Sequence, residues 1–144
     1  MKCCVQGCAG VIGSTLSDRL LRAGDSVRGL DNFSTGQRHF LRMAYAHPSF
    51  QLVEADLFNT HAWTHALADC EVVFHLAANA DVRFGTQHPH KDLQQNTMVT
   101  FRVLEAMREH QVKKIIFAST GSVYGEAAVF PTPAVLSQLP PYNT

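Results

Sequence analysis

The sequence predicts an α/β fold in which helices cover a doubly wound parallel sheet. Two observations support this fold class. Short apolar segments of strand length alternate along the 144 residues with longer segments whose apolar residues recur at helical spacing. Three glycines, spaced G-x-x-G-x-x-G from Gly7 to Gly13, lie where the first apolar segment passes into the first helical one. A glycine-rich strand-to-helix turn of this kind is typical of Rossmann-type folds.

The glycine turn follows the apolar residues 3–5 and precedes an amphipathic helix. Gly7 allows a tight turn, Gly10 lets the backbone approach a pyrophosphate with no Cβ in the way, and Gly13 lets the helix pack close to the strand. The free N–H groups and the partial positive charge at the helix N-terminus favour an anion. The motif therefore predicts a phosphate-binding turn.

A second apolar segment, with Val27 and Leu30, ends at Asp31, which lies about 18 residues after the last glycine. An acidic residue near this spacing binds ribose hydroxyls in dinucleotide-binding folds. A plain structural turn without a ligand is the alternative interpretation. A P-loop is excluded because no Lys-Ser or Lys-Thr pair follows the glycines.

The remaining elements continue the alternation. We expect a helix over 37–46, a strand over 50–54, a short helix from Asn59 or Thr60 to Leu67, a strand over 71–76, a long helix over 91–110 and a strand over 112–118. The long helix is apolar at positions whose spacing predicts burial: Met98, Phe101, Val103, Leu104 and Met107. With a switch point between the first and fourth strands, the strand order is 3-2-1-4-5 and a ligand binds at the carboxyl ends of the strands.

Composition and length suggest one domain, which we place at 1–130, followed by a proline-rich irregular tail over 131–144. Lys and Arg total 12, as do Asp and Glu, so the composition provides no basic surface for nucleic acid. The apolar segment after Lys2 is too short for a signal sequence or a membrane span. We therefore expect a cytoplasmic protein.

Metal binding is not favoured by the spacing of the candidate ligands. Cys3, Cys4, Cys8 and Cys70 lack paired C-x-x-C spacing, so we expect them to be small core residues. His61 and His65 stand one helical turn apart, but Ala62 occupies the position where a zinc hydrolase has Glu. We interpret these two histidines as part of a solvent-exposed helix face.

Taken in order, the motifs resemble the N-terminal half of the extended short-chain dehydrogenases, and in particular the NAD-dependent epimerase/dehydratase family, of which UDP-glucose 4-epimerase is a familiar member. The resemblance covers about residues 1–133. It rests on the glycine motif and on the following groups: Asp31-Asn32-Phe33-Ser34-Thr35-Gly36, Asp56-Leu57, His75-Leu76-Ala77-Ala78, Asn96, and Ser119-Thr120-Gly121-Ser122-Val123-Tyr124-Gly125.

This resemblance implies an NAD site built from several segments. The pyrophosphate would meet the glycine turn: Gly7, Gly10, Val11, Ile12 and Gly13. Asp31 would bind the adenosine ribose. The adenine would lie against the residues after the second and third strands: Asn32, Phe33, Ser34, Thr35, Gly36, Asp56 and Leu57. The nicotinamide half would lie along the following: Leu76, Ala77, Ala78, Asn96 and Ser119.

The resemblance also implies a reaction. In this family a Tyr takes a proton from a sugar hydroxyl while a hydride passes to NAD, and a Lys four residues after the Tyr lowers its pKa. Thr120 falls where the family has a Ser or Thr that bonds the substrate hydroxyl; a strand-end hydroxyl bonded to its own backbone is the alternative. Tyr124 belongs to a Val-Tyr-Gly loop, which leaves Tyr142 as the candidate base. No Lys follows Tyr142 in the sequence.

We therefore expect the NAD-binding domain of a nucleotide-sugar epimerase or dehydratase, with an incomplete catalytic pair, a nucleotide-sugar substrate and a second copy of the chain as partner. The family's later strands and its sugar-nucleotide domain are not encoded in these residues. One alternative is a non-catalytic NAD-binding sensor or partner module. The other is a self-associating remnant without a ligand.

Overall fold

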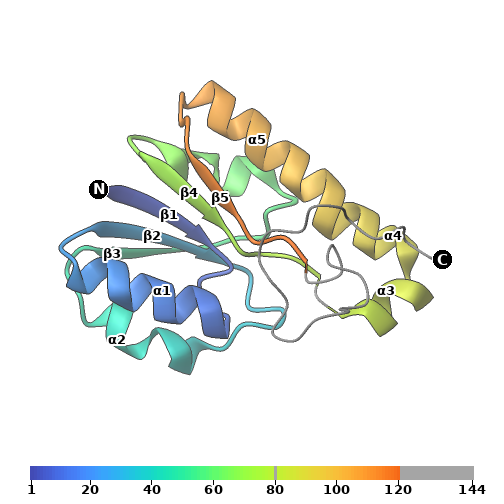
Figure 1. Cartoon of the computed structure of the whole chain (residues 1–144), viewed down its shortest axis with the longest axis horizontal. Coiled ribbons are helices and arrows are strands. Elements are labelled where there is room, and N and C mark those ends of the chain that lie inside the picture. The colour runs from blue at the N-terminus through green and yellow to red at the C-terminus, as the bar shows by residue number, and fades with distance from the viewer. Residues whose placement is uncertain (80, 121–144) are drawn as a thin grey trace, which may run out of the picture.

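The computed structural model describes residues 1–79 and 81–120 and contains a five-stranded sheet (Figure 1). The strands are β1 (Lys2–Gln6), β2 (Ser26–Asp31), β3 (Phe50–Glu54), β4 (Val72–His75) and β5 (Ile115–Phe117). Every adjacent pair is parallel, and the order is β3-β2-β1-β4-β5. The expected fold class and strand order are confirmed.

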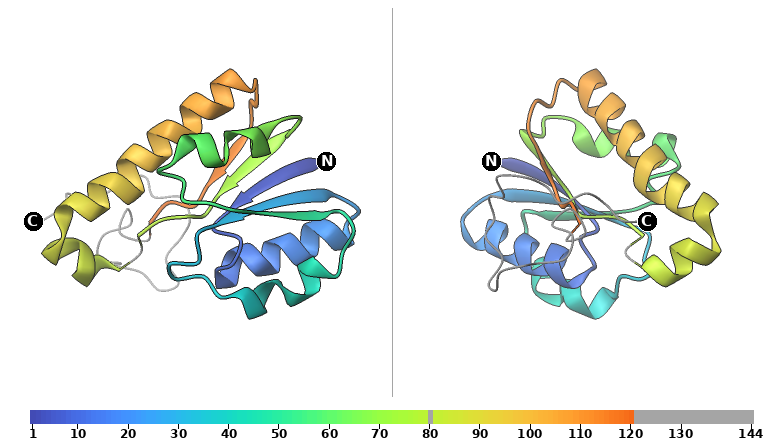
Figure 2. Two further views of the ribbon diagram at one scale, coloured as in Figure 1. Left: turned by 180° about the vertical axis from the view of Figure 1, so that it is seen from behind. Right: turned by 45° about the vertical axis from the view of Figure 1, so that its right-hand side comes forward.

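Helices cover both faces of this sheet, as the two views in Figure 2 show. The helices α1 (Val11–Arg22) and α2 (Arg42–Tyr45) lie on one face, and α5 (Val99–Glu109) lies on the other. Two shorter helices, α3 (Val82–Gln87) and α4 (Pro89–Asp92), precede α5, and a π-helical segment, η4 (Leu93–Met98), joins α4 to α5. The expected long helix is therefore present as the run from α4 through α5.

The core consists of two apolar clusters, one on each face of the sheet. The cluster under α5 includes Cys4, Trp63 and Val103, and the cluster under α1 and α2 includes Cys8 and Leu41. The four cysteines are free and buried, which confirms that they are core residues.

Two expected helices have a different form. The segment 37–46 consists of the 3₁₀ turn η1 (Arg38–Leu41) followed by the short helix α2, and each contributes one fully buried residue, Leu41 and Ala44. The segment 59–67 consists of two 3₁₀ turns, η2 (Thr60–Ala62) and η3 (Thr64–Leu67), separated by the fully buried Trp63. Asn59 precedes the first of these turns without making a capping hydrogen bond.

The expectation of burial along the long helix is wrong in part. Val103 and Met107 are buried, but Met98, Phe101 and Leu104 are 37%, 57% and 46% exposed. The sheet lies on one side of the helix only, so it buries one apolar face and leaves the second uncovered.

No helix within the described ranges is long and apolar enough to cross a membrane. The proline-rich tail 131–144, including Tyr142, lies outside the described residues.

Candidate functional site

The glycine turn is tightly built at Gly7 and Gly13. Gly7 has a φ of +79°, and a Cβ there would lie 2.9 Å from the backbone N of Ala77. A Cβ at Gly13 would lie 2.1 Å from the carbonyl oxygen of Gly7, so α1 packs directly against the turn. The N–H groups of Gly7 and Cys8 donate to the carbonyl oxygen of Leu30, at 2.8 and 3.2 Å, and tie the turn to β2.

Gly10 differs from the other two glycines because it faces open space. Among residues 1–79 and 81–120, the only atom outside its neighbours within 4 Å of a Cβ placed there is the Gly7 carbonyl oxygen, at 3.4 Å. Gly10 is also the N-cap of α1, whose first turn contains no acidic residue. Val11 and Ile12 follow it with exposed side chains. This end of α1 can therefore receive an anion against free backbone N–H groups.

Asp31 lies beside the glycine turn at the end of β2. One carboxylate oxygen accepts the N–H of Ala9 at 2.8 Å, and the other accepts the N–H of Phe33 at 2.8 Å. A Cβ at Gly36 would lie 2.8 Å from both the Ala9 side chain and the carboxylate of Asp31, so the turn after β2 folds back onto the glycine turn. The carboxylate is thus fixed in place, and each oxygen keeps acceptor capacity for a ligand hydroxyl.

The residues after β2 and β3 form a connected polar rim. Asn32 donates its Nδ2–H to Asp56 at 3.1 Å, and its Oδ1 accepts the N–H of Ser34 at 3.0 Å. The other oxygen of Asp56 accepts the N–H of Phe58 at 2.8 Å. Phe33 instead packs its ring beneath the Arg38 guanidinium, 4.1 Å from the ring centroid.

A hollow of about 130 Å³, here called the first hollow, lies between these elements. Most residues expected at the adenosine and pyrophosphate of a dinucleotide line it: Gly7, Gly10, Asp31, Asn32, Ser34, Thr35, Gly36, Asp56 and Leu57. Leu76, Ala77 and Ala78, which were expected along the nicotinamide half, line it as well. Val11, Ile12, Gly13 and Phe33 do not line it. Four further lining residues were not expected from the sequence: Leu30, Ala55, Gln95 and Val99.

A second hollow of about 540 Å³ adjoins the first. Ala77 and Ala78 line both hollows and therefore form their shared wall. Of the residues expected at a nicotinamide or a substrate, Asn96, Ser119 and Thr120 line the second hollow. It also contains residues without an expected role: His75, Asn79, Asp92, Thr100, Phe117 and Ala118.

Asn96 holds the segment that follows the shared wall. Its Oδ1 accepts the N–H of Asn79 at 2.8 Å, and its Nδ2–H donates to the carbonyl oxygen of Asn79 at 3.2 Å. The Asn79 side chain in turn donates to Asp92 at 2.7 Å. The helical run thus fixes the chain leaving β4 through both its backbone and its side chain.

His75 lies at the buried floor of the second hollow. Its Nδ1 lies 2.6 Å from Oε1 of Gln6, its in-register partner on β1, and its Nε2 lies 3.2 Å from the Thr100 hydroxyl. The side chain is 2% exposed, and burial lowers its pKa from 6.5 to about 4. The ring is therefore neutral at pH 7.

This buried histidine predicts a pH dependence of stability. Below pH 6.5 the unfolded chain binds a proton that the native His75 does not bind until about pH 4. The free energy of unfolding should therefore fall by about 3 kcal/mol between pH 7 and pH 4 through this group. Urea titrations across this range should show the slope in the wild type and a smaller slope in His75→Asn. The exposed His65 provides the control, since His65→Gln should keep the slope; an unchanged slope in His75→Asn would contradict the prediction.

Thiol chemistry does not contribute to this site. Cys8 is the cysteine of the glycine turn, and burial raises the pKa of its thiol to about 12. A protonated, fully buried thiol is neither a nucleophile nor a metal ligand. What remains is a pair of adjoining hollows. The first is lined by the carboxylates of Asp31 and Asp56 and by Gly7 and Gly10 of the glycine turn, and the second is lined by amide and hydroxyl groups.

Comparison with known proteins gives a consistent result. A family model described as the NAD-dependent epimerase/dehydratase family matches residues 3–144. The UDP-glucose 4-epimerase of Mycolicibacterium smegmatis is 42% identical over 135 residues, covering 92% of this chain and 43% of that protein.

Solved structures of nucleotide-sugar 4-epimerases are also similar to this chain. The Thermus thermophilus UDP-glucose 4-epimerase, solved with NAD, is 33% identical with a TM-score of 0.78 over 92% of this chain and 44% of that one. A Bacillus cereus UDP-glucuronic acid 4-epimerase variant, solved with a fluorinated UDP-glucuronic acid and NAD, is 35% identical with a TM-score of 0.83 over 99% and 46%. The chain therefore spans less than half the length of these relatives.

Proposed function

This chain belongs to the NAD-dependent epimerase/dehydratase family, and we propose that it forms the NAD-binding part of a nucleotide-sugar 4-epimerase. The observation that carries the proposal is the pair of hollows that meet at Ala77 and Ala78, with the open Gly10 position beside the first. A dinucleotide has two halves joined by a pyrophosphate. Two adjoining hollows beside a glycine turn match that division.

In this proposal the adenosine half lies in the first hollow and the nicotinamide half in the second. Asp31 accepts hydrogen bonds from the ribose, Asp56 and Leu57 lie beside the adenine, and the glycine turn faces the pyrophosphate. Asn96 and Ser119 lie at the nicotinamide end. The absence of a side chain at Gly10 supports this arrangement, because a Cβ would project into the space that the pyrophosphate needs.

Bound NAD supplies the acceptor for a hydride from a sugar carbon. The residues of this chain would bind and orient the reactants: Thr120, at the second hollow, would bond the sugar hydroxyl, and Tyr142 is the candidate for the group that takes its proton. The proposed substrate is a nucleotide-sugar, as the names of the relatives suggest.

We propose residues 1–130 as the NAD domain and a cytoplasmic location, which the four free thiols favour.

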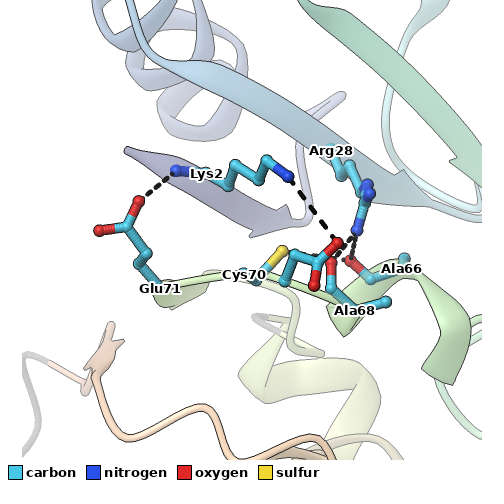
Figure 3. A network of polar contacts seen from close by, with 7 residues as sticks. Lys2, Arg28, Ala66, Ala68, Cys70 and Glu71 are labelled. Carbon is cyan, nitrogen blue, oxygen red and sulfur yellow. Dashed lines mark hydrogen bonds and ion pairs between the residues drawn. The ribbon is translucent and has the colours of Figure 1, made fainter.

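We expect NAD to bind in preference to NADP. The Asp31 carboxylate would meet the ribose hydroxyls and repel a 2′-phosphate, a like-charge contact that can cost several kcal/mol, or about a hundredfold in Kd. Two arginines could offset this repulsion, but both have other partners. Arg38 donates to both oxygens of Glu54, at 2.8 and 2.7 Å. Arg28 donates to the carbonyl oxygens of Ala66 and Ala68 (Figure 3), and neither arginine lines the first hollow.

Calorimetric titration of both cofactors at one salt concentration tests the proposed function and this preference together. Asp31→Asn should narrow the difference between the two affinities, because the amide has no charge to repel the 2′-phosphate. Equal or tighter binding of NADP by the wild type would contradict the assignment of Asp31, and failure to bind either cofactor would contradict the proposed function.

We also propose that two copies of the chain associate through the uncovered face of the helical run. Leu93, Phe101 and Leu104 are 51%, 57% and 46% exposed there, an apolar surface of the kind that marks an interface. Sedimentation should show a dimer or larger assembly that Phe101→Glu dissociates. Glu105→Gln, on the same helix, is the control and should leave the assembly intact. A monomeric wild type at high concentration would rule out this interface.

A further inference from the structure

The helical run from α4 to α5 presents two rows of side chains, one to each hollow. Gln95 and Val99 line the first hollow, whereas Asp92, Asn96 and Thr100 line the second. Each row has a spacing of four residues, which places its members on one face of a helix. Gln95 and Asn96 lie in the π-helical segment η4, a form that is frequent at functional sites. The neighbours Gln95 and Asn96 therefore face different halves of the site.

The first hollow contains few side-chain donors for a charged ligand. No Lys or Arg lines it in the part of the chain that the structure describes. The side chains there that can donate a hydrogen bond are those of Asn32, Ser34, Thr35 and Gln95. Asn32 already donates to Asp56, and Ser34 and Thr35 follow β2 on the side of Asp31. Gln95 is thus the donor that comes from the opposite side, on the helical run.

Val99 holds the part of the helical run next to Gln95 against the core. Val99 lies one turn further along the helix, is 1% exposed and belongs to the apolar cluster under α5. Gln95 itself is half-buried, and its amide has no hydrogen-bond partner among residues 1–79 and 81–120. A half-buried amide at the edge of a polar hollow, without a partner in the protein, is available to a ligand.

We propose that Gln95 is a further cofactor-binding residue, whose Nε2–H donates to the diphosphate of the bound dinucleotide. This inference rests on the proposed function. The diphosphate would then be held from both sides, by the N–H groups of the glycine turn and by the amide of Gln95. The amide matters here because no cation lines the first hollow among the described residues.

Two substitutions test this role. Gln95→Ala removes the donor, and the loss of a hydrogen bond to a charged group should weaken NAD binding about tenfold. Gln95→Glu has nearly the same shape but places a carboxylate beside the diphosphate, so it should weaken binding about a hundredfold, and more at low salt. The neighbour Gln94 provides the matched control. It is also half-buried in η4 but lines neither hollow, so Gln94→Ala and Gln94→Glu should bind NAD within about twofold of the wild type.

Titrations with fragments of NAD show which part of the dinucleotide contacts Gln95. ADP, which carries the diphosphate, should show the same losses as NAD in the Gln95 variants, and adenosine, followed by NMR, should show none. Three results would overturn the inference: NAD binding by Gln95→Glu within twofold of the wild type, an equal loss in Gln94→Glu, or an adenosine loss as large as that of ADP. A wild type that binds neither NAD nor ADP would instead overturn the proposed function and this inference with it.

Discussion

A Gly10→Val variant should lose NAD binding and keep its fold. Gly10 has φ −79° and ψ 170°, an extended conformation that valine adopts readily. Within the described part of the chain, a Cβ there would meet only the Gly7 carbonyl oxygen, at 3.4 Å, so these residues leave room for the side chain. The valine methyl groups would occupy the space beside the first hollow where the pyrophosphate is proposed to lie. Binding should therefore fall below detection through steric exclusion.

Calorimetry with NAD, together with circular dichroism and thermal unfolding, separates these two effects. Gly24→Asn is the control, because a Cβ at Gly24 meets no described atom within 4 Å and Asn is among the side chains that adopt a positive φ, here +88°, at the least cost. This control variant should bind NAD as the wild type does. Unchanged NAD affinity in Gly10→Val would place the phosphate site elsewhere, whereas loss of the folded state would show that the turn has no room for a side chain.

A protein consisting of these 144 residues should bind NAD without turning over a nucleotide-sugar. Deprotonating a sugar hydroxyl near neutral pH needs a base, and an unassisted Tyr with a pKa of about 10 is almost fully protonated there. Thr120 can orient a hydroxyl but cannot take its proton at this pH. Positioning is also incomplete, because the chain spans 43% of its Mycolicibacterium smegmatis relative, and orientation can contribute about 7–11 kcal/mol to lowering a barrier.

The assay combines the purified chain with NAD and UDP-glucose and follows UDP-galactose and NADH absorbance. We expect no product above the rate without protein. Turnover that disappears in Thr120→Ala or Tyr142→Phe would contradict the prediction and would show that these residues already assemble a competent site. Turnover that persists in both variants would indicate a contaminating enzyme.

The parts of the fold that could be predicted from the sequence depend on local signals. The glycine spacing requires a particular turn, since Gly7 has a positive φ and a Cβ at Gly13 would collide with the Gly7 carbonyl. Asp31 follows from the end of an apolar strand. Parallel strands joined by right-handed crossovers bring their carboxyl ends together, which explains why Asp31, Asp56 and Ala77, from the ends of three strands, line one hollow.

The parts that could not be predicted depend on tertiary packing. Spacing alone identifies the apolar residues of a helix but not which face meets the sheet, so Phe101 and Leu104 were wrongly expected to be buried. The position of Gln95 at the first hollow also depends on which face of the helical run meets the sheet, so it could not be predicted either. Trp63 interrupts an expected helix because its indole is buried in the core. There its Nε1–H donates to the Leu57 carbonyl oxygen at 3.0 Å. The buried pair of His75 and Gln6 depends on the register between β1 and β4.

The central claim is that NAD binds across the two hollows, and an NMR titration of the labelled chain with NAD tests it most directly. Backbone amide shifts should concentrate at the glycine turn, at Asp31 and the turn that follows it, and at Ala77 and Ala78, where the two hollows meet. The amides at the start of β3 and at the far end of α5 should change little. Shifts confined to other surfaces, or none at a saturating NAD concentration, would contradict the claim.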